Sequence, residues 1–214
     1  PLTFSRTKLD FSSTLNKRVN EYFKSNNINR SGNWEMVFKT IVMFLLYFGP
    51  YALIVSGVIT SPLLLLCIVI IMSFGLGGIG LSVMHDANHG AYSKRGWVNS
   101  LLGYSLNLIG ANSFNWKMQH NVLHHTYTNV HEEDEDIFSR GVLRLTPHSK
   151  WKFIYKFQHI YAWFLYGLMT LSWMFVNDFA RLIRYQNNGL AKKHKANMSK
   201  EWIILIATKL FYVS

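Results

Sequence analysis

The longest apolar pattern in the chain covers residues 40–84, none of which is Asp, Glu, Lys or Arg. A membrane-spanning helix needs about 20 predominantly apolar residues, so this stretch is long enough for two helices and a turn. Gly, Thr, Ser and Pro within residues 56–62 supply the turn. The pattern predicts a transmembrane helical hairpin made of residues 37–55 and 62–84. A hairpin buried in a soluble protein is disfavoured, because soluble helices of this length keep a polar face.

The N-terminal segment, residues 1–36, is polar and mixed in charge. Within it Leu15, Val19 and Phe23 recur at four-residue steps, which predicts an amphipathic helix with a narrow apolar stripe. Two placements fit this pattern: the helix lies on the membrane surface before the first span, or it packs on another element of the protein.

Three further apolar segments follow the hairpin. Residues 97–115 are interrupted by Asn, Ser and Gly and are short for a span, so we expect an interfacial or re-entrant segment. Residues 153–176 are long enough to cross, and residues 202–214 begin a fourth segment. The basic loop at 178–200 would then lie outside the cell, against the positive-inside rule, so the third segment either crosses or lies in the interface.

We therefore expect an all-α integral membrane protein with a single domain over residues 1–214. Its parts would be the N-terminal amphipathic segment (1–36), a transmembrane hairpin (37–84), a histidine-rich region (85–150) and a second hairpin (151–214). We expect that second hairpin to be incomplete, because the last apolar run stops at the end of the printed chain. We expect the N-terminal end to be cut as well, because Pro1 is not an initiator.

Composition excludes several classes of protein. The net charge is +11, but the basic residues are spread around apolar helices, which favours lipid headgroups over nucleic acid as the partner. The single cysteine, Cys67, lies inside the second span and leaves no internal disulfide and no cysteine zinc site. Four glycines near the end of that span (Gly75, Gly77, Gly78 and Gly80) lack the flanking strand of a dinucleotide loop, so we assign them to helix packing.

Five of the nine histidines fall in two short motifs, HDANH at 85–89 and HNVLHH at 120–125. Residues four apart share a face of a helix, so each motif can present a pair of imidazoles to one ion. Neutral imidazole binds zinc, copper, iron and nickel. Five nitrogen ligands exceed one tetrahedral site and favour two ions, with iron, for oxygen chemistry, the best candidate. The predicted ligands are His85, His89, His120, His124 and His125.

Nearby polar residues are candidates to hold these imidazoles. Asp86 and Asn88 lie between the first two histidines, and Asp86 either accepts a hydrogen bond from an imidazole N–H or caps the helix end. Asp134 and Asp136, in the acidic run 132–136, either take the same role or lie in a solvated loop. His131, His148 and His194 are interpreted as loop histidines, while His159 either lines the substrate path or faces the headgroups.

The two motifs resemble the first two histidine boxes of the membrane fatty acid desaturases. The sequence segments around the motifs resemble those of the bacterial acyl-lipid and acyl-CoA group, which includes linoleoyl-CoA-type front-end enzymes. These segments include GLSVMHDANHGAYS, NWKMQHNVLHHTYTN and DEDI. The resemblance implies transmembrane hairpins under a cytoplasmic cap holding two irons, in a bacterial inner membrane. It also implies O2-dependent formation of a cis double bond in an acyl chain linked to CoA or lipid, with electrons from cytochrome b5 or ferredoxin.

Two family features are missing from the printed sequence. The third histidine box and the H-P-G-G haem motif do not occur in it. Without the third box we expect this fragment alone to be inactive. Two alternatives stay open: a membrane di-iron hydroxylase of lipids, alkanes or carotenoids, which would use the same boxes, and a metal transporter, which residues 40–84 disfavour because they contain no acidic residue.

Overall fold

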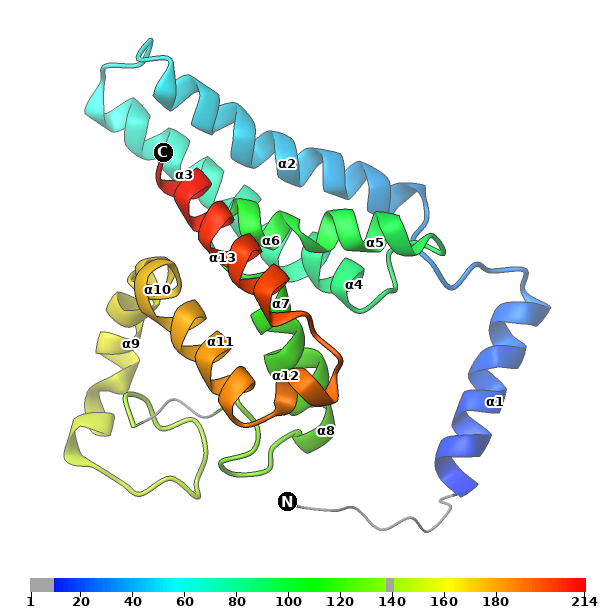
Figure 1. Cartoon of the computed structure of the whole chain (residues 1–214). Helices are drawn as coiled ribbons and strands as arrows, with labels where there is room; N and C mark the ends of the chain where they lie inside the picture. Colours follow the sequence, from blue (N-terminus) through cyan, green and yellow to red (C-terminus); the bar gives the residue numbers. More distant parts are fainter. Residues whose placement is uncertain (1–9, 138–140) are drawn as a thin grey trace.

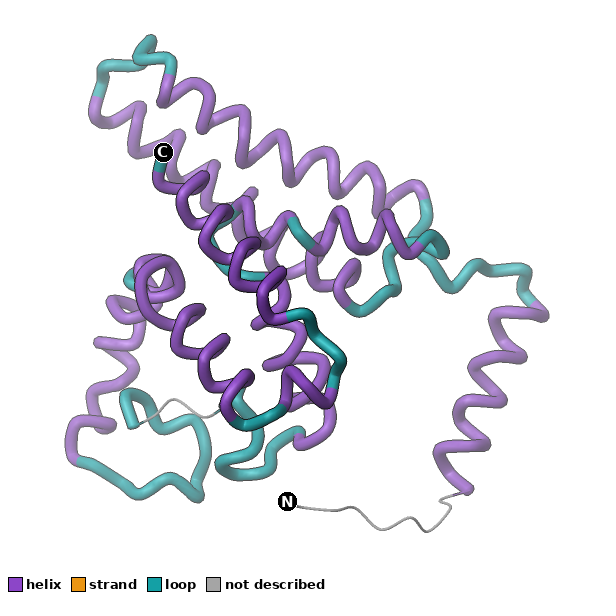
Figure 2. The backbone as a smooth tube through the Cα atoms, viewed as in Figure 1, coloured by secondary structure: helices purple, strands orange, loops and turns teal. Residues whose placement is uncertain are grey.

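The structure is a computed structural model that describes residues 10–137 and 141–214. Within these residues every regular element is a helix, as the apolar pattern predicts (Figures 1 and 2). Two of the helices, Trp34–Val55 and Pro62–Asn88, are long and apolar enough to cross a membrane. The expected all-α membrane architecture is confirmed.

The first helix, α1 (Asp10–Ser25), stands apart from the other helices and connects to them through an extended linker (Figure 1). None of its residues is buried, and the apolar stripe of Leu15 and Val19 is exposed. The predicted amphipathic helix is therefore present, and its placement on a membrane surface stays a prediction.

The predicted hairpin consists of α2 (Trp34–Val55) and α3 (Pro62–Gly78), which lie side by side (Figure 1). Asn33 caps α2 by accepting a hydrogen bond from the Met36 amide at 3.1 Å, and Pro62 opens α3 at a position where a missing N–H costs nothing. The second span continues beyond α3 through the π-helical η1 (Ile79–Val83) into α4 (Met84–Asn88). The first histidine motif thus sits at the end of a membrane helix.

Glycine sets the distance between the two hairpin helices. A Cβ added at Gly75 would lie 2.5 Å from the backbone nitrogen of Tyr47, so only glycine permits this approach. At Gly77 and Gly80 no atom lies within 4 Å of the same position. The assignment of this glycine cluster to helix packing is confirmed at Gly75, where small residues let helix backbones meet.

The segment at 97–115 is broken into short helices: α5 (Gly96–Gly103), α6 (Ser105–Leu108) and α7 (Ser113–Trp116). None has the length of a span, which agrees with the expected interfacial or re-entrant segment. Asn112 caps α7 by accepting from the Asn115 amide at 2.9 Å. The chain then runs directly into η2 (Lys117–His124), a π-helix, and α8 (His125–Tyr127), which carry the second histidine motif.

The third apolar segment is bent. A short 3-10 helix, η3 (Phe153–Phe157), leads into α9 (Gln158–Gly167), and after a 58° bend the chain continues as α10 (Met169–Ser172), η4 (Trp173–Asn177) and α11 (Asp178–Asn187). This geometry fits a broken span as well as a re-entrant segment, so both placements expected for the segment stay open.

The last helices, α12 (Leu190–Lys193) and α13 (Met198–Val213), return the chain toward the hairpin (Figure 1). A buried ion pair joins Lys209 on α13 to Asp178 at the start of α11. The Lys209 ammonium also donates to the Gly110 carbonyl at 2.7 Å, and Asn115 donates to the Asp178 carbonyl at 2.7 Å. These contacts tie α11 and α13 to the segment that precedes the second histidine motif.

Candidate metal centre

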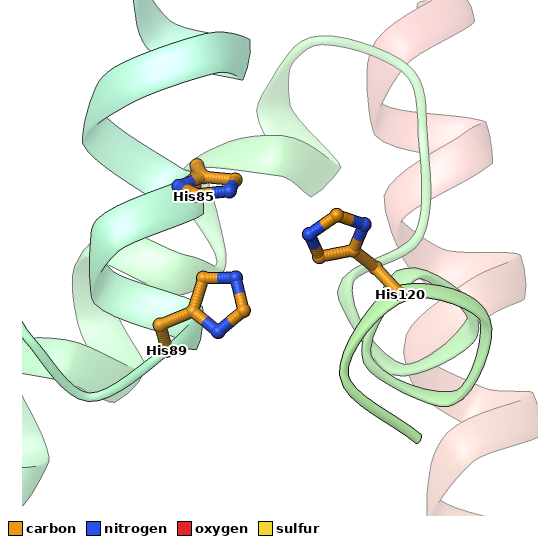
Figure 3. Close-up of side chains that lie close together, drawn as sticks. All are labelled: His85, His89 and His120. Atoms are coloured by element: carbon orange, nitrogen blue, oxygen red, sulfur yellow. The ribbon is translucent and has the colours of Figure 1, made fainter. Parts of the chain in front are cut away.

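The fold brings the two histidine motifs together. His85 on α4 and His89 just after it face His120 on η2, and the three imidazoles point toward one another (Figure 3). One nitrogen from each of these three rings lies within 4.8 Å of the others. The same limit holds for a second group formed by His120, His124 and the Asp136 carboxylate. His120 belongs to both groups.

The π-helical backbone of η2 explains how three histidines of one motif reach one side. In an α-helix a residue five positions on is rotated by about 140°, so His120 and His125 would face different directions. Here the His125 amide donates to the His120 carbonyl, a bond across five residues that places residue i+5 close beneath residue i. The ring centroids of His120 and His125 are accordingly 4.9 Å apart.

All five predicted ligands take part in one cluster of rings. The His125 centroid lies 4.9 Å from that of His89 on the other motif, and the His120 and His124 rings stack at 5.1 Å. His85 and His89 are 4.5 Å apart. A hydrogen bond also joins the two motifs, because the Asn121 side-chain amide donates to the Asn88 backbone carbonyl at 2.9 Å.

Carboxylates hold three of the imidazoles by their Nδ1 atoms. His120 lies 2.9 Å from Asp136, His124 lies 2.9 Å from Asp134, and His85 lies 3.1 Å from Asp86. An ionised carboxylate only accepts hydrogen bonds, so Nδ1 must carry the proton in each pair. In a neutral ring this leaves the Nε2 lone pair free for a metal, which is the carboxylate–histidine arrangement common at metal sites.

Asp134 has the most enclosed setting of these carboxylates, since its side chain is fully buried. Burial works to raise the pKa of Asp134, but the Asn129 amide, the His124 imidazole and the Asp136 amide all donate to it. Together these hydrogen bonds hold its pKa below the ordinary value. The carboxylate is therefore ionised at neutral pH, as an acceptor for His124 must be.

Two of the imidazoles, His89 and His120, are kept neutral. Partial burial, together with the nearby His85, His120 and His125, lowers the pKa of His89 to about 4. Burial likewise lowers the pKa of His120, although Asp136 opposes the shift. Metal ligation needs the neutral ring, so both histidines are in the competent form near pH 7.

The predicted supporting residues differ in what they contact. Asp86, Asp134 and Asp136 each meet an imidazole, whereas the Asn88 side chain accepts from the Ser113 hydroxyl at 3.2 Å and contacts the Met84 sulfur. The Asn88 carbonyl accepts from Asn121. In this structure Asn88 therefore joins chain segments around the site.

Sequence reasoning missed two neighbours of the rings. Trp116 stacks on His120 with ring centroids 4.5 Å apart and lies 5.7 Å from both His85 and His89. Its position four residues before His120 was the available signal. Gln119 donates to Asp136 at 2.7 Å, which no sequence pattern indicates.

The remaining histidines lie away from this cluster. His148, His159 and His194 are exposed. The His131 ring lies 5.9 Å from that of His148, and its Nε2 lies 3.9 Å from the Glu132 carboxylate. The described residues thus separate five clustered histidines from four peripheral ones.

The donor set fits a metal that takes nitrogen ligands and keeps open positions. Imidazoles on two segments converge, and carboxylates orient three of them from behind. Zinc, copper and iron all accept such ligands, while no cysteine lies in the groups that could hold an ion within the described residues.

Comparison with known proteins identifies the class. The family model for fatty acid desaturases matches residues 59–213, which is most of the chain. The chain belongs to the fatty acid desaturase family. No solved structure matched it.

Curated relatives agree with this assignment. The sn-1 linoleoyl-lipid 6-desaturase of Arthrospira platensis is 35% identical over 186 residues, which cover 86% of this chain and 50% of the relative. The protein of the same name from Synechocystis sp. (strain ATCC 27184 / PCC 6803 / Kazusa) is 34% identical, covering 88% and 51%. The acyl-lipid (8-3)-desaturase of Physcomitrium patens is 35% identical, covering 95% and 42%. The chain spans about half the length of these relatives.

Proposed function

We propose that the protein containing this chain is a membrane fatty acyl desaturase that forms a cis double bond with O2. The observation that carries the proposal is the cluster of five imidazoles at the end of a membrane hairpin, with three of them held by carboxylates. Family membership and relatives that are named acyl-lipid desaturases support it.

The metal would be iron, as two ions. His85, His89 and His120 would hold one ion, and His124 and His125 would contribute to the other. Asp136 lies behind His120 and His124, at their Nδ1 atoms, and leaves their Nε2 atoms free. When bound and reduced, iron supplies the activation of O2 and the removal of hydrogen from an unactivated methylene, which no acid–base group could achieve.

The chain's own residues would orient the ligands and shield the chemistry. Asp134 and Asp136 fix the ring planes of His124 and His120. The Trp116 ring covers His120 on the side of the buried apolar cluster of Tyr47, Ile79 and Met84. An acyl chain entering from the membrane side would reach the rings where water is scarce, which protects the reaction from side products.

The substrate would be an acyl group in lipid linkage, since the relatives named above carry acyl-lipid or linoleoyl-lipid names. A CoA-linked substrate is the other form that a desaturase could use. Electrons would come one at a time from cytochrome b5 or ferredoxin. We place the protein in a bacterial inner membrane with the histidines on the cytoplasmic side, a placement that the basic residues around the hairpin favour.

Expression of the full-length protein in a host with a simple lipid profile tests the proposal. Gas chromatography–mass spectrometry of the host fatty acids should reveal a new cis double bond and locate it. A new hydroxyl group in its place would assign the protein to the hydroxylases. Unchanged fatty acids, with a donor and the acyl substrate supplied and iron bound, would contradict the proposal.

A further inference from the structure

Glu135 lies between the two carboxylates that hold the second histidine group, yet it contacts neither His120 nor His124. Its side chain is 14% exposed and accepts two hydrogen bonds from α11, from Arg184 Nη2 at 2.7 Å and from the Tyr185 hydroxyl at 2.8 Å. Three consecutive acidic residues thus reach three different partners. Asp134 and Asp136 face the imidazoles, and the residue between them faces a helix.

The helix that donates hydrogen bonds to Glu135, α11, is held in place by buried contacts at both of its ends. Leu182 and Tyr185 on α11 have no exposed surface, and Tyr185 packs with Met118, which belongs to η2. At its other end α11 holds Asn115 through Asp178. Because α11 contacts the histidine-bearing segment at both ends, it offers the acidic loop a support whose position relative to the rings is fixed.

We propose that Glu135 is a positioning residue that anchors the acidic loop on α11 and so sets the orientation of the His120 and His124 imidazoles. The inference rests on the proposed function only in treating these imidazoles as metal ligands. Two neighbouring carboxylates can orient two rings only if the loop that carries them does not shift. A charge-assisted hydrogen bond from Arg184 is roughly twice as strong as a neutral one and supplies that restraint.

The same contacts indicate which substitutions are informative. Glu135→Gln keeps the length and shape of the side chain but removes its charge. Tyr185→Phe keeps the buried ring and removes only the hydroxyl donor. Glu132→Gln makes the same chemical change in the same acidic run, and Glu132 is 75% exposed, so it is the matched control.

The test is an anaerobic Fe(II) titration of the full-length protein in detergent, with Mössbauer spectra of the loaded forms and melting curves of the metal-free forms. Loss of an outer hydrogen-bond partner at a metal site weakens binding by about 10–100-fold. Glu135 affects the imidazoles only through its chain neighbours Asp134 and Asp136. We therefore expect Glu135→Gln to weaken iron binding by about tenfold, at the lower end of that range. Tyr185→Phe should have a smaller effect in the same direction, and Glu132→Gln should bind as wild type.

Mössbauer spectra separate positioning from a purely structural role. Reorientation of His120 and His124 should change the iron doublets in Glu135→Gln, whereas Glu132→Gln should keep the wild-type spectrum. Wild-type affinity and spectra in both Glu135→Gln and Tyr185→Phe would overturn the inference, as would an equal loss in Glu132→Gln. If Glu135→Gln does not fold, Tyr185→Phe decides alone, since it removes no charge.

Failure of the inference differs from failure of the proposed function. Histidine-dependent iron binding that weakens in Glu135→Gln, in a protein that forms no new double bond, would support the inference and contradict the desaturase assignment. A new double bond formed by the wild-type protein, together with unchanged iron binding in Glu135→Gln and Tyr185→Phe, would support the desaturase assignment and contradict the inference.

Discussion

The two histidine groups are positioned in different ways. His85 and His89 follow directly from a membrane helix, and their hydrogen-bonded carboxylate, Asp86, is the next residue in the chain and is 31% exposed. His120 and His124 instead depend on carboxylates 16 and 10 residues further on, one of which is fully buried. The hairpin places the first group, and tertiary contacts with a loop and α11 place the second.

This difference predicts that the second group is the more sensitive to substitution outside the ligands themselves. The largest effect of all should come from a ligand. His124→Ala should abolish desaturation and lower bound iron in the full-length protein, because no other described side chain replaces that imidazole beside Asp134. His194→Ala, at an exposed histidine, is the control and should keep full activity. Full activity in His124→Ala would remove His124 from the ligand set.

A comparison of matched aspartates separates the two groups. Asp134→Asn removes the carboxylate hydrogen-bonded to His124 and leaves only Asp136, 3.5 Å from the same Nδ1, so it should weaken iron binding by about 10–100-fold. Asp86→Asn makes the same change at the first group, where the carboxylate is more exposed, and should cost less. Iron titration of both variants checks this order. Equal losses would show that the two groups are supported alike.

The helix packing that positions the second histidine group can be disrupted at the buried Lys209–Asp178 ion pair, which does not contact the imidazoles. Lys209→Met leaves the Asp178 carboxylate buried without its cation, and the loss of one partner of a buried pair costs about 3–5 kcal/mol of folding stability. Thermal unfolding of the full-length protein in detergent measures this loss. The double variant Lys209→Met with Asp178→Asn removes both charges and should recover part of it. No recovery would mean that the ion pair is not the source of the loss.

The first histidine group, His85 and His89, follows the second span, and that span packs closely against α2 at Gly75. Gly75→Ala would place a methyl group against the Tyr47 backbone, and such overpacking costs about 1–3 kcal/mol. Gly77→Ala adds the same methyl group where no atom lies within 4 Å and should leave stability unchanged. Melting temperatures of the two variants give the comparison. Equal melting temperatures would contradict the packing role of Gly75.

Much of the fold could be predicted because membrane helices are encoded locally. The uncharged stretch at 40–84 and its turn predict the hairpin, and α2 and α3 begin and end within a few residues of the expected bounds, with the second span continuing to Asn88. The 58° bend between α9 and α10 was not predictable, because residues 153–176 are uniformly apolar across it.

Part of the candidate metal site could likewise be predicted from the sequence, and part of it could not. Four-residue spacing indicated His85, His89, His120 and His124, since such steps place rings on one face, and His125 was included because it adjoins His124. The π-helical backbone of Lys117–His124, which brings His125 beside His120, left no signal in the spacing. The roles of Trp116, Glu135 and Tyr185 depend on contacts between segments up to 50 residues apart, which a single sequence does not encode locally.

The most direct test of the central claim is the iron content of the full-length protein and of its His120→Ala and His85→Ala variants, measured side by side at saturating iron. His120 belongs to both candidate groups, whereas His85 belongs to one. We predict two irons per wild-type chain, a partial loss in His85→Ala and a larger loss in His120→Ala, because the His120 ring adjoins the other four imidazoles and shares Asp136 with His124. Iron content that is unchanged in His120→Ala would contradict the claim that these imidazoles form the metal centre.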